Sequence, residues 1–280
     1  MKLAVISDIH GNLPALQTTL EHVDRWQPDH VVVNGDIINR GPNSRACWKL
    51  IAERRDTMGW ELVRGNHEEY VANWPEDDSQ TGGVALEIYQ SSYWTFCQLE
   101  EEMHSISNLP EQVSLQTDDG GLVRLTHGSM RGNTDGVYED TPDHVLREQI
   151  APAPAVFCTA HTHRPLVREL NGTLVINSGA AGTTFDGDPR ISYARLLWGA
   201  KRWKAEIVRL DYDRRAAGYH FESTGYLHEG GPLVEIFFEE WRLARPLVNR
   251  WAAIYEQAVR DGQLSLRQSV DDFLAGVTGT

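Results

Sequence analysis

Short apolar runs alternate with amphipathic segments through the first third of the chain, and this alternation restricts the fold more than any other feature. Residues 2–7, 31–34 and 60–64 have the length and composition of buried strands. Residues 13–23 and 43–54 carry apolar side chains at helical spacing. Strands that alternate with helices in this way predict an α/β fold with a largely parallel sheet covered by helices.

Length, charge and cysteine content limit where such a protein works. A chain of 280 residues can form one large core, or one core with a small appendage. The formal charge of −14 disfavours nucleic acid and anionic membranes as partners. Three scattered cysteines fit a reducing compartment. We see neither a secretory signal nor a membrane-spanning run, so a cytoplasmic location is expected.

Side chains of the types that bind metals gather in five short segments, each directly after a predicted strand. Open α/β sheets collect their ligands at the carboxyl ends of the strands. Carboxylates mixed with imidazoles favour manganese, iron, zinc, nickel or cobalt over magnesium or calcium. Seven candidate ligands are too many for one zinc ion and indicate two ions that share a bridging carboxylate. The seven are Asp8, His10, Asp36, Asn66, His127, His161 and His163.

In order and composition, the five segments resemble those of the calcineurin-like metallophosphoesterase superfamily, and the likeness extends to about residue 210. The segments are 7–11, 34–36, 64–68, 126–128 and 160–163. The resemblance implies an α/β fold with a layered αββα sandwich flanked by helices, followed here by a helical C-terminal extension. It also implies a hydrolase that uses two divalent ions.

The resemblance gives each position a role. One ion is expected at Asp8, His10, Asp36 and His163, and the other at Asp36, Asn66, His127 and His161, with Asp36 as the bridge. His67 matches the family's catalytic histidine, which would stabilise the phosphoryl oxygen or protonate the leaving alkoxide. The alternatives are a surface histidine at a helix start for His67, and a solvent-facing pair at a strand end for His161 and His163.

Two features point to different branches of the superfamily. Residues 35–42 and 63–68 resemble serine/threonine protein phosphatases and symmetrical diadenosine-tetraphosphate hydrolases, and by that analogy Arg40 would grip a substrate phosphate. Arg131 is a second phosphate-gripping candidate, since the segment around it resembles small bacterial phosphoesterases. The alternative for Arg40 is an exposed arginine in a turn, and the alternative for Arg131 is a solvated arginine in a loop. Other segments that resemble the small bacterial enzymes are 7–16, 161–165, 177–182 and 186–193.

Asn39 is a departure from the protein phosphatases, which carry aspartate at this position to orient the catalytic histidine. An asparagine can accept the same hydrogen bond but adds no negative charge, so a protonated His67 is less favoured. We therefore expect weak activity on poor leaving groups and a preference for activated esters or anhydrides.

The composition changes near Asp211, which divides the chain into a catalytic domain (1–210) and a helical extension (211–280). Within the first part, residues 84–110 are expected to form a helical cap. In the extension, residues 232–260 have apolar side chains at helical spacing, and Pro246 should divide that helix. We expect the extension to pack on the core or on a partner, which would allow a homo-oligomer.

Taken together, the sequence predicts a metal-dependent phosphoesterase that hydrolyses phosphomonoesters, phosphodiesters or nucleotides by direct attack of a hydroxide that bridges the two ions. Manganese is the preferred metal, with iron, zinc, nickel or cobalt as alternatives. The expected partner is a small phosphorylated substrate or nucleotide. A serine/threonine protein phosphatase or a diadenosine-tetraphosphate hydrolase is the alternative function. A catalytically silent scaffold with the same fold is a second, and a nuclease is disfavoured by the negative charge.

Overall fold

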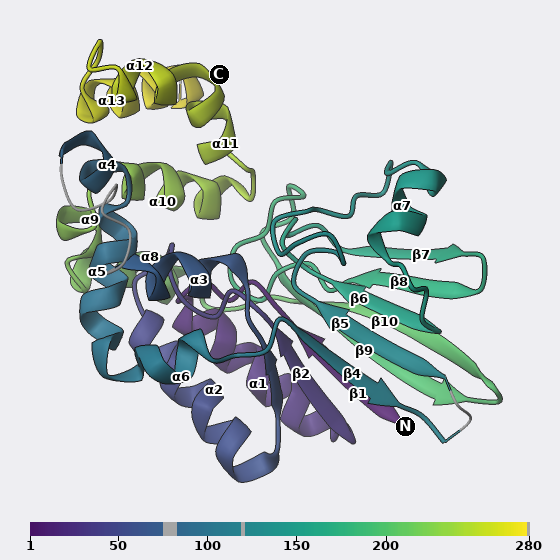
Figure 1. Cartoon of the computed structure of the whole chain (residues 1–280). Coiled ribbons are helices and arrows are strands. Elements are labelled where there is room, and N and C mark those ends of the chain that lie inside the picture. Colours follow the sequence, from purple (N-terminus) through teal and green to yellow (C-terminus); the bar gives the residue numbers. More distant parts are fainter. Residues whose placement is uncertain (75–82, 119–120, 279–280) are drawn as a thin grey trace.

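Two five-stranded sheets form the centre of the computed structural model, which describes residues 1–74, 83–118 and 121–278 (Figure 1). The first sheet has the order β10 (Arg202–Leu210), β9 (Ile191–Gly199), β1 (Lys2–Ile6), β2 (His30–Asn34) and β3 (Glu61–Val63). The second has the order β4 (Gln112–Gln116), β5 (Leu122–Thr126), β6 (Val156–Thr159), β8 (Thr173–Asn177) and β7 (Leu166–Leu170).

Both sheets are mixed, so the expectation of a largely parallel sheet was wrong. The pairs β1–β2, β2–β3, β5–β6 and β6–β8 are parallel. The remaining pairs in the described chain are antiparallel. Hairpins account for most of the difference, because β4–β5, β7–β8 and β9–β10 are each joined by a connection too short for a parallel crossover. The parallel pairs nevertheless place the ends of β1, β2 and β3 at one edge.

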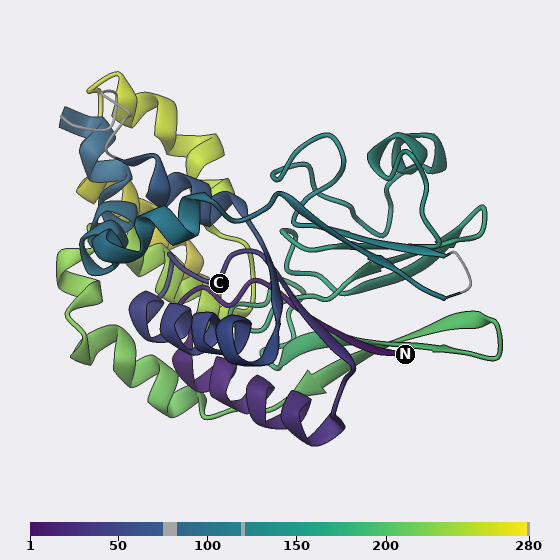
Figure 2. The ribbon, with the colours of Figure 1, turned by 60° about the horizontal axis from the view of Figure 1, so that its bottom comes forward.

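The alternation of side chains along the strands creates the layers. Leu3 and Val5 of β1 pack against strands of the second sheet, whereas Ala4 and Ile6 face helices α1 (Leu13–Trp26) and α2 (Ser44–Met58). In the second sheet, Phe157 packs beneath α7 (Asp143–Gln149). The predicted αββα sandwich is therefore confirmed, with helices outside both sheets (Figure 2).

A second, aromatic core joins two helical regions that are far apart in the sequence. Trp94 of the 83–107 region lies 4.6 Å from Tyr226 of the extension, measured between ring centroids. Figure 1 shows the C-terminal helices stacked beside α4 and α5. The 83–107 region contains α4 (Gly83–Ile88), α5 (Gln90–Leu99), η3 (Glu100–Glu102) and α6 (Met103–Ser107), and α3 (Asn66–Ala72) precedes it. The extension contains α8 (Arg214–Ser223), α9 (Tyr226–Glu229), α10 (Leu233–Leu243), α11 (Val248–Trp251), η4 (Ala252–Glu256), α12 (Gln257–Arg260) and α13 (Leu266–Thr278).

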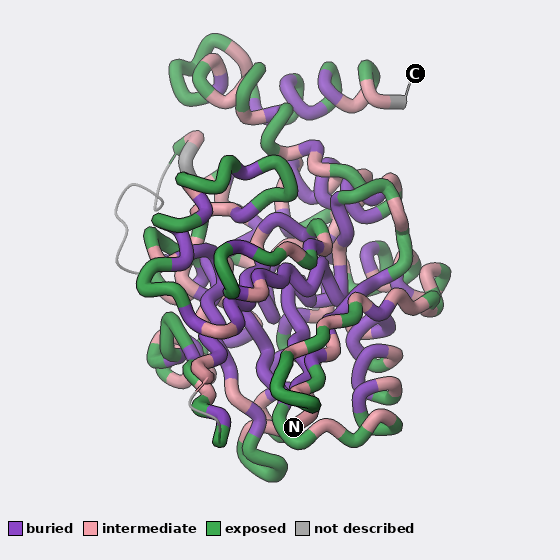
Figure 3. The backbone as a smooth tube through the Cα atoms, turned by 90° about the vertical axis from the view of Figure 1, so that its right-hand side faces the viewer, coloured by how far each residue is buried: buried purple, intermediate pink, exposed green. Residues whose placement is uncertain are grey.

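The break between α10 and α11 contains Pro246, as predicted. Burial is almost continuous in the middle of the molecule, whereas buried and exposed turns alternate along the peripheral helices (Figure 3). Within the described residues, no helix has the length and apolar character needed to cross a membrane.

Candidate metal centre

The loops that follow β1 and β2 are joined by backbone hydrogen bonds. The amides of Ile9 and His10 both donate to the carbonyl oxygen of Asp36, at 2.8 and 3.0 Å. The amide of Gly11 donates to the carbonyl of Ile37 at 3.1 Å. The loop that carries Asp8 and His10 is therefore fixed relative to the loop that carries Asp36.

Left-handed backbone conformations concentrate in these turns. Such a conformation costs a residue with a side chain roughly 1 kcal/mol or more, so it persists only where the surroundings enforce it. Asn39 and Arg40 have φ of +68° and +62°. Five of the seven candidate ligands also have positive φ: Asp8 (+53°), His10 (+46°), Asp36 (+55°), His161 (+65°) and His163 (+55°).

The side chain of Glu68 helps to hold these turns in their left-handed conformations. Its buried carboxylate accepts hydrogen bonds from the amides of Asp36 (2.8 Å), Ile37 (2.7 Å), Ile38 (3.2 Å) and Gly65 (2.9 Å). Burial raises the pKa of Glu68 to about 7, and these donors act in the opposite direction. Only glycine fits at position 65, because a Cβ there would lie 2.1 Å from Asp36 Oδ1. Glu68 thus holds the turn that carries Asp36.

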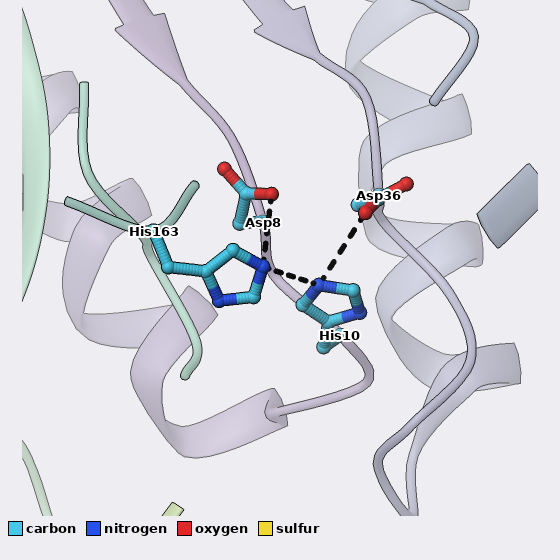
Figure 4. A group of neighbouring side chains, drawn as sticks. All are labelled: Asp8, His10, Asp36 and His163. Atoms are coloured by element: carbon cyan, nitrogen blue, oxygen red, sulfur yellow. Dashed lines mark hydrogen bonds and ion pairs between the residues drawn. The ribbon is translucent and has the colours of Figure 1, made fainter. Parts of the chain in front are cut away.

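Four of the candidate ligands converge from three loops (Figure 4). His163 Nε2 lies 3.3 Å from Asp8 Oδ1 and 3.2 Å from His10 Nε2, and His10 Nε2 lies 3.5 Å from Asp36 Oδ2. The Nδ1 of His163 faces the carbonyl of Thr183 at 2.5 Å, so Nδ1–H donates there and Nε2 is left for an ion. These four side chains form one group that could hold a cation.

A second group shares Asp36 with the first. His127 Nε2 lies 3.2 Å from Asp36 Oδ2 and 3.0 Å from Asn66 Oδ1, and His161 Nδ1 lies 2.9 Å from the same Asn66 oxygen. The Nδ1 of His127 faces the carbonyl of Asn34 at 2.8 Å, which directs its Nε2 toward Asp36. All seven predicted ligands therefore meet in two groups with Asp36 between them, which we call the cradle.

Most charges in the cradle fit cations, and His127 is the exception, because Asp36 outweighs the effect of burial and raises the pKa of His127 to about 10. Burial and the neighbouring carboxylate raise the pKa of Asp8 to about 8. Burial lowers the pKa values of His10 and His163 well below the usual range, so both imidazoles are neutral, the form that binds metals. Within the described chain, Asp8 Oδ1 is buried without a hydrogen-bond donor. A divalent ion would stabilise this carboxylate and satisfy its free oxygen.

His67 is oriented by the side-chain amide of Asn39. Asn39 Oδ1 already accepts a hydrogen bond from the amide of Arg40 at 2.9 Å, so its Nδ2 faces His67 Nδ1 at 3.1 Å and Ser92 Oγ at 2.9 Å. Asn39 therefore donates to the ring and does not accept from it, although an asparagine could do either. Nδ1 must be unprotonated, which leaves the single proton on Nε2. Burial lowers the pKa of His67 to about 3, in keeping with the neutral ring.

Arg40 lies beside the cradle and is held by the C-terminal extension. Its guanidinium forms an ion pair with Glu240 of α10, and the two side chains are 14% and 1% exposed. The guanidinium also lies 4.8 Å from the centre of the Phe237 ring. Glu240 accepts two further hydrogen bonds, from the amides of Leu247 and Val248, at 2.6 and 2.8 Å. Arg40 is thus a packed, paired residue and not the exposed turn arginine of the alternative reading.

Arg131 is not brought to the cradle. Its guanidinium makes two hydrogen bonds of 2.8 Å with Asp135, and its side chain is 43% exposed. Among the described residues it does not line the cavity in front of the cradle, whereas Arg164 does. The geometry of Arg131 is that of the solvated loop arginine considered as its alternative.

Three residues with a place at this site were not singled out from the sequence. Glu68 follows Gly65 at capping-box spacing, a signal that could have revealed it. Glu240 falls on the apolar stripe of its helix, seven residues after Leu233, where an acid requires a partner. Arg164 follows the His161–His163 segment directly, but nothing in its spacing separates it from other loop arginines.

The αββα fold and the shared Asp/His cluster define a metal-dependent phosphoesterase, and comparison with known proteins gives the family. Residues 1–199 match the calcineurin-like phosphoesterase superfamily domain, and the chain belongs to that superfamily. Its membership, together with the buried Asp/His cluster, points to a site for two divalent ions.

Relatives are found among bacteria and archaea. An uncharacterized protein of Methanocaldococcus jannaschii is 28% identical over 233 residues, which cover 77% of this chain and 89% of the relative. The phosphodiesterase YfcE of Escherichia coli K12 is 26% identical over 202 residues, which cover 70% of this chain and 87% of YfcE. The structure of a metallophosphoesterase from Sphaerobacter thermophilus superposes with a TM-score of 0.68 at 24% identity, covering 87% of this chain and all of that one.

Proposed function

We propose that this chain hydrolyses phosphate esters, with phosphodiesters as its main substrates, at a two-metal centre in the cradle. The observation that carries the proposal is that seven oxygen and nitrogen donors from separate loops form two groups that share Asp36. The relationship to the phosphodiesterase YfcE supports the choice of diesters. We further propose manganese as the native metal, since mixed carboxylate and imidazole donors suit it, and the cytoplasm as the place of action.

In this proposal Asp8, His10, Asp36 and His163 hold one ion, and Asp36, Asn66, His127 and His161 hold the other. Two divalent ions supply an activated water and offset the charge that develops on the phosphate. His67 carries its proton on Nε2 and would hydrogen-bond a phosphate oxygen or the leaving oxygen. Arg40, held in place by Glu240, would orient the phosphate from the side of the extension.

The two alternative functions make different demands on the site. A silent scaffold needs no complete ligand set, and the presence of all seven donors at close range weighs against it. A protein phosphatase needs room for a polypeptide. A diadenosine-tetraphosphate hydrolase needs further cationic groups to bind a polyphosphate. The surroundings of Arg40 provide little free positive charge, because Glu240 already pairs with it.

A panel of substrates against metals tests the proposal. Bis(p-nitrophenyl) phosphate, p-nitrophenyl phosphate, a phosphopeptide and diadenosine tetraphosphate would each be assayed with manganese, iron, zinc, nickel, cobalt and magnesium. We expect the diester to have the highest kcat/KM, with manganese as the best metal. A folded, metal-loaded protein that hydrolyses none of the four would contradict the proposal and favour the scaffold.

A further inference from the structure

The cavity in front of the cradle is larger than a phosphate requires. Its volume is about 810 Å³, within the range of roughly 300–1,000 Å³ that holds a drug-sized ligand. Asp36, Asn66, His67, His161 and His163 line the part of it that belongs to the site, which we call its floor. A substrate with its phosphorus at this floor would leave most of the volume to its organic part.

Apolar side chains of the C-terminal extension supply another part of the lining, beside Asn249 and Glu256 of the same region. We call this the helical wall, and it consists of Leu233, Phe237, Pro246, Val248 and Trp251. Three of these side chains also belong to the buried cluster of the extension, so the wall is backed by a packed core. A charged or strongly hydrated group placed against such a surface would lose water without gaining partners.

Aromatic side chains from outside the extension also line the cavity. Tyr70 and Tyr138 are 42% and 44% exposed, so both rings are accessible to a bound molecule. The Tyr70 ring lies 5.3 Å from the His67 ring, which places an aromatic surface directly beside the cradle. A planar, apolar substituent on the phosphorus would meet ring faces from the rim to the wall.

The cavity is poor in free positive charge among the residues that the structure describes. Arg40 is paired with Glu240, whereas Arg164 keeps its charge and donates from Nε to the carbonyl of Phe185 at 3.2 Å. Two acids also line the cavity: Glu69, and Glu256, which is paired with Arg260. A polyphosphate chain would carry several negative charges into this region, where Arg164 offers one compensating charge and Glu69 would repel it.

We infer that the helical wall selects the substrate: the site takes an ester of a single phosphate that bears an aromatic or similarly planar apolar substituent, and it rejects polyphosphates. This inference rests on the proposed function. The cradle determines which bond is attacked, and α10 and α11 determine what else the phosphorus carries.

Two diesters with the same leaving group test the inference. p-Nitrophenyl phenyl phosphate and p-nitrophenyl methyl phosphate both release p-nitrophenolate, so they differ in the group that the helical wall would contact. We expect the phenyl ester to be favoured in kcat/KM by about tenfold, from burial of the additional ring. Phe237→Ala should lower that ratio several-fold. Phe238→Ala is the matched control, because Phe238 is the next residue of α10 and packs on Phe221 and Trp241 away from the cavity.

A binding measurement separates this inference from the proposed function. Phenylphosphonate and methylphosphonate would be titrated calorimetrically into the manganese-loaded protein, and we expect the phenyl compound to bind about tenfold more tightly. If no ester is hydrolysed but this preference is present and is lost in Phe237→Ala, the proposed function fails and the wall inference holds. Equal binding of the two phosphonates, a ratio that Phe237→Ala leaves unchanged, or faster hydrolysis of diadenosine tetraphosphate than of the phenyl ester would overturn the inference.

Discussion

The cradle and the helical wall line the same cavity but are built in opposite ways. The cradle takes single polar side chains from loops spread between residues 8 and 163, and its turns have left-handed backbone conformations. The wall takes apolar side chains from one stretch, 233–251, which consists of α10, α11 and the break between them that contains Pro246. In the cradle each residue has a distinct role, whereas in the wall several side chains together form one apolar surface. We therefore expect substitutions in the cradle to abolish function and those in the wall to change substrate preference.

The largest effect should come from Asp36, which stands between both groups of donors. Asp36→Asn removes the charge from the shared oxygen, so both ions should bind weakly. Changes next to a ligand already cost about 10–100-fold, so we expect kcat/KM to fall at least a hundredfold. Elemental analysis should show less than the two ions of the wild type. Asp24→Asn, at a surface ion pair with Arg54, is the control and should keep both metal and activity. Full metal content in Asp36→Asn would contradict the bridging role.

Glu68 tests whether the cradle depends on backbone support. Glu68→Gln retains one acceptor oxygen for the amides of Asp36, Ile37, Ile38 and Gly65, and leaves others without a partner. An unsatisfied buried amide costs about 1–3 kcal/mol, so the free energy of unfolding of the metal-free protein should fall by about that amount. Urea denaturation in the presence of a chelator measures it. Glu53→Gln on the exposed face of α2 should leave stability unchanged, and equal stability of the two variants would remove the supporting role.

Glu240 connects the two regions, and its substitution should affect binding more than chemistry. Glu240→Gln weakens the hold on Arg40 while keeping an acceptor for the amides of Leu247 and Val248. We expect roughly a tenfold rise in KM for the diester, the size of a lost charge-assisted hydrogen bond, with a smaller change in kcat. Glu239→Gln is the neighbouring control, since Glu239 pairs with Arg242 at the surface. An unchanged KM would argue that Arg40 does not reach the phosphate.

The smallest expected effect is that of Asn39→Asp, which should alter the dependence of activity on the leaving group. Asn39→Asp can accept a hydrogen bond from His67 Nδ1, which would reverse the present arrangement and favour the protonated ring. A raised pKa of His67 keeps the charged form up to higher pH, so the activity on poor leaving groups should rise and then fall as pH exceeds that value. We expect a several-fold gain for phenyl phosphate relative to p-nitrophenyl phosphate. Asn43→Asp, which alters a similar pair with His220, is the control. An unchanged leaving-group dependence and pH–rate profile would refute the idea.

The cradle could be predicted from the sequence because each of its segments is local. A strand followed at once by Asp8 or His127 identifies both the position and the chemistry, and parallel pairing brings such positions to one edge. The layered fold could be predicted from the sequence for the same reason. The direction of the Asn39 amide could not, because it depends on the amide of Arg40 and on Ser92 of a distant helix.

The helical wall was beyond sequence reasoning for a different reason. Periodicity identified the helices and Pro246 located the break, but apolar spacing cannot say which neighbour a helix meets. Phe237 and Phe238 are alike in the sequence, yet only Phe237 lines the cavity. The partner of Arg40 was likewise hidden, since two hundred residues separate it from Glu240.

The left-handed turns of the cradle have a consequence for any attempt to make this enzyme more robust. Positions such as His161 and His163 would relax if glycine replaced the imidazole, because glycine adopts positive φ without steric cost. Selection for heat resistance alone would thus favour changes that destroy the hydrolase, whereas selection for turnover would retain the distortion. Thermal robustness and catalysis are set against each other at these residues, so stabilising changes should be sought in the periphery of the fold.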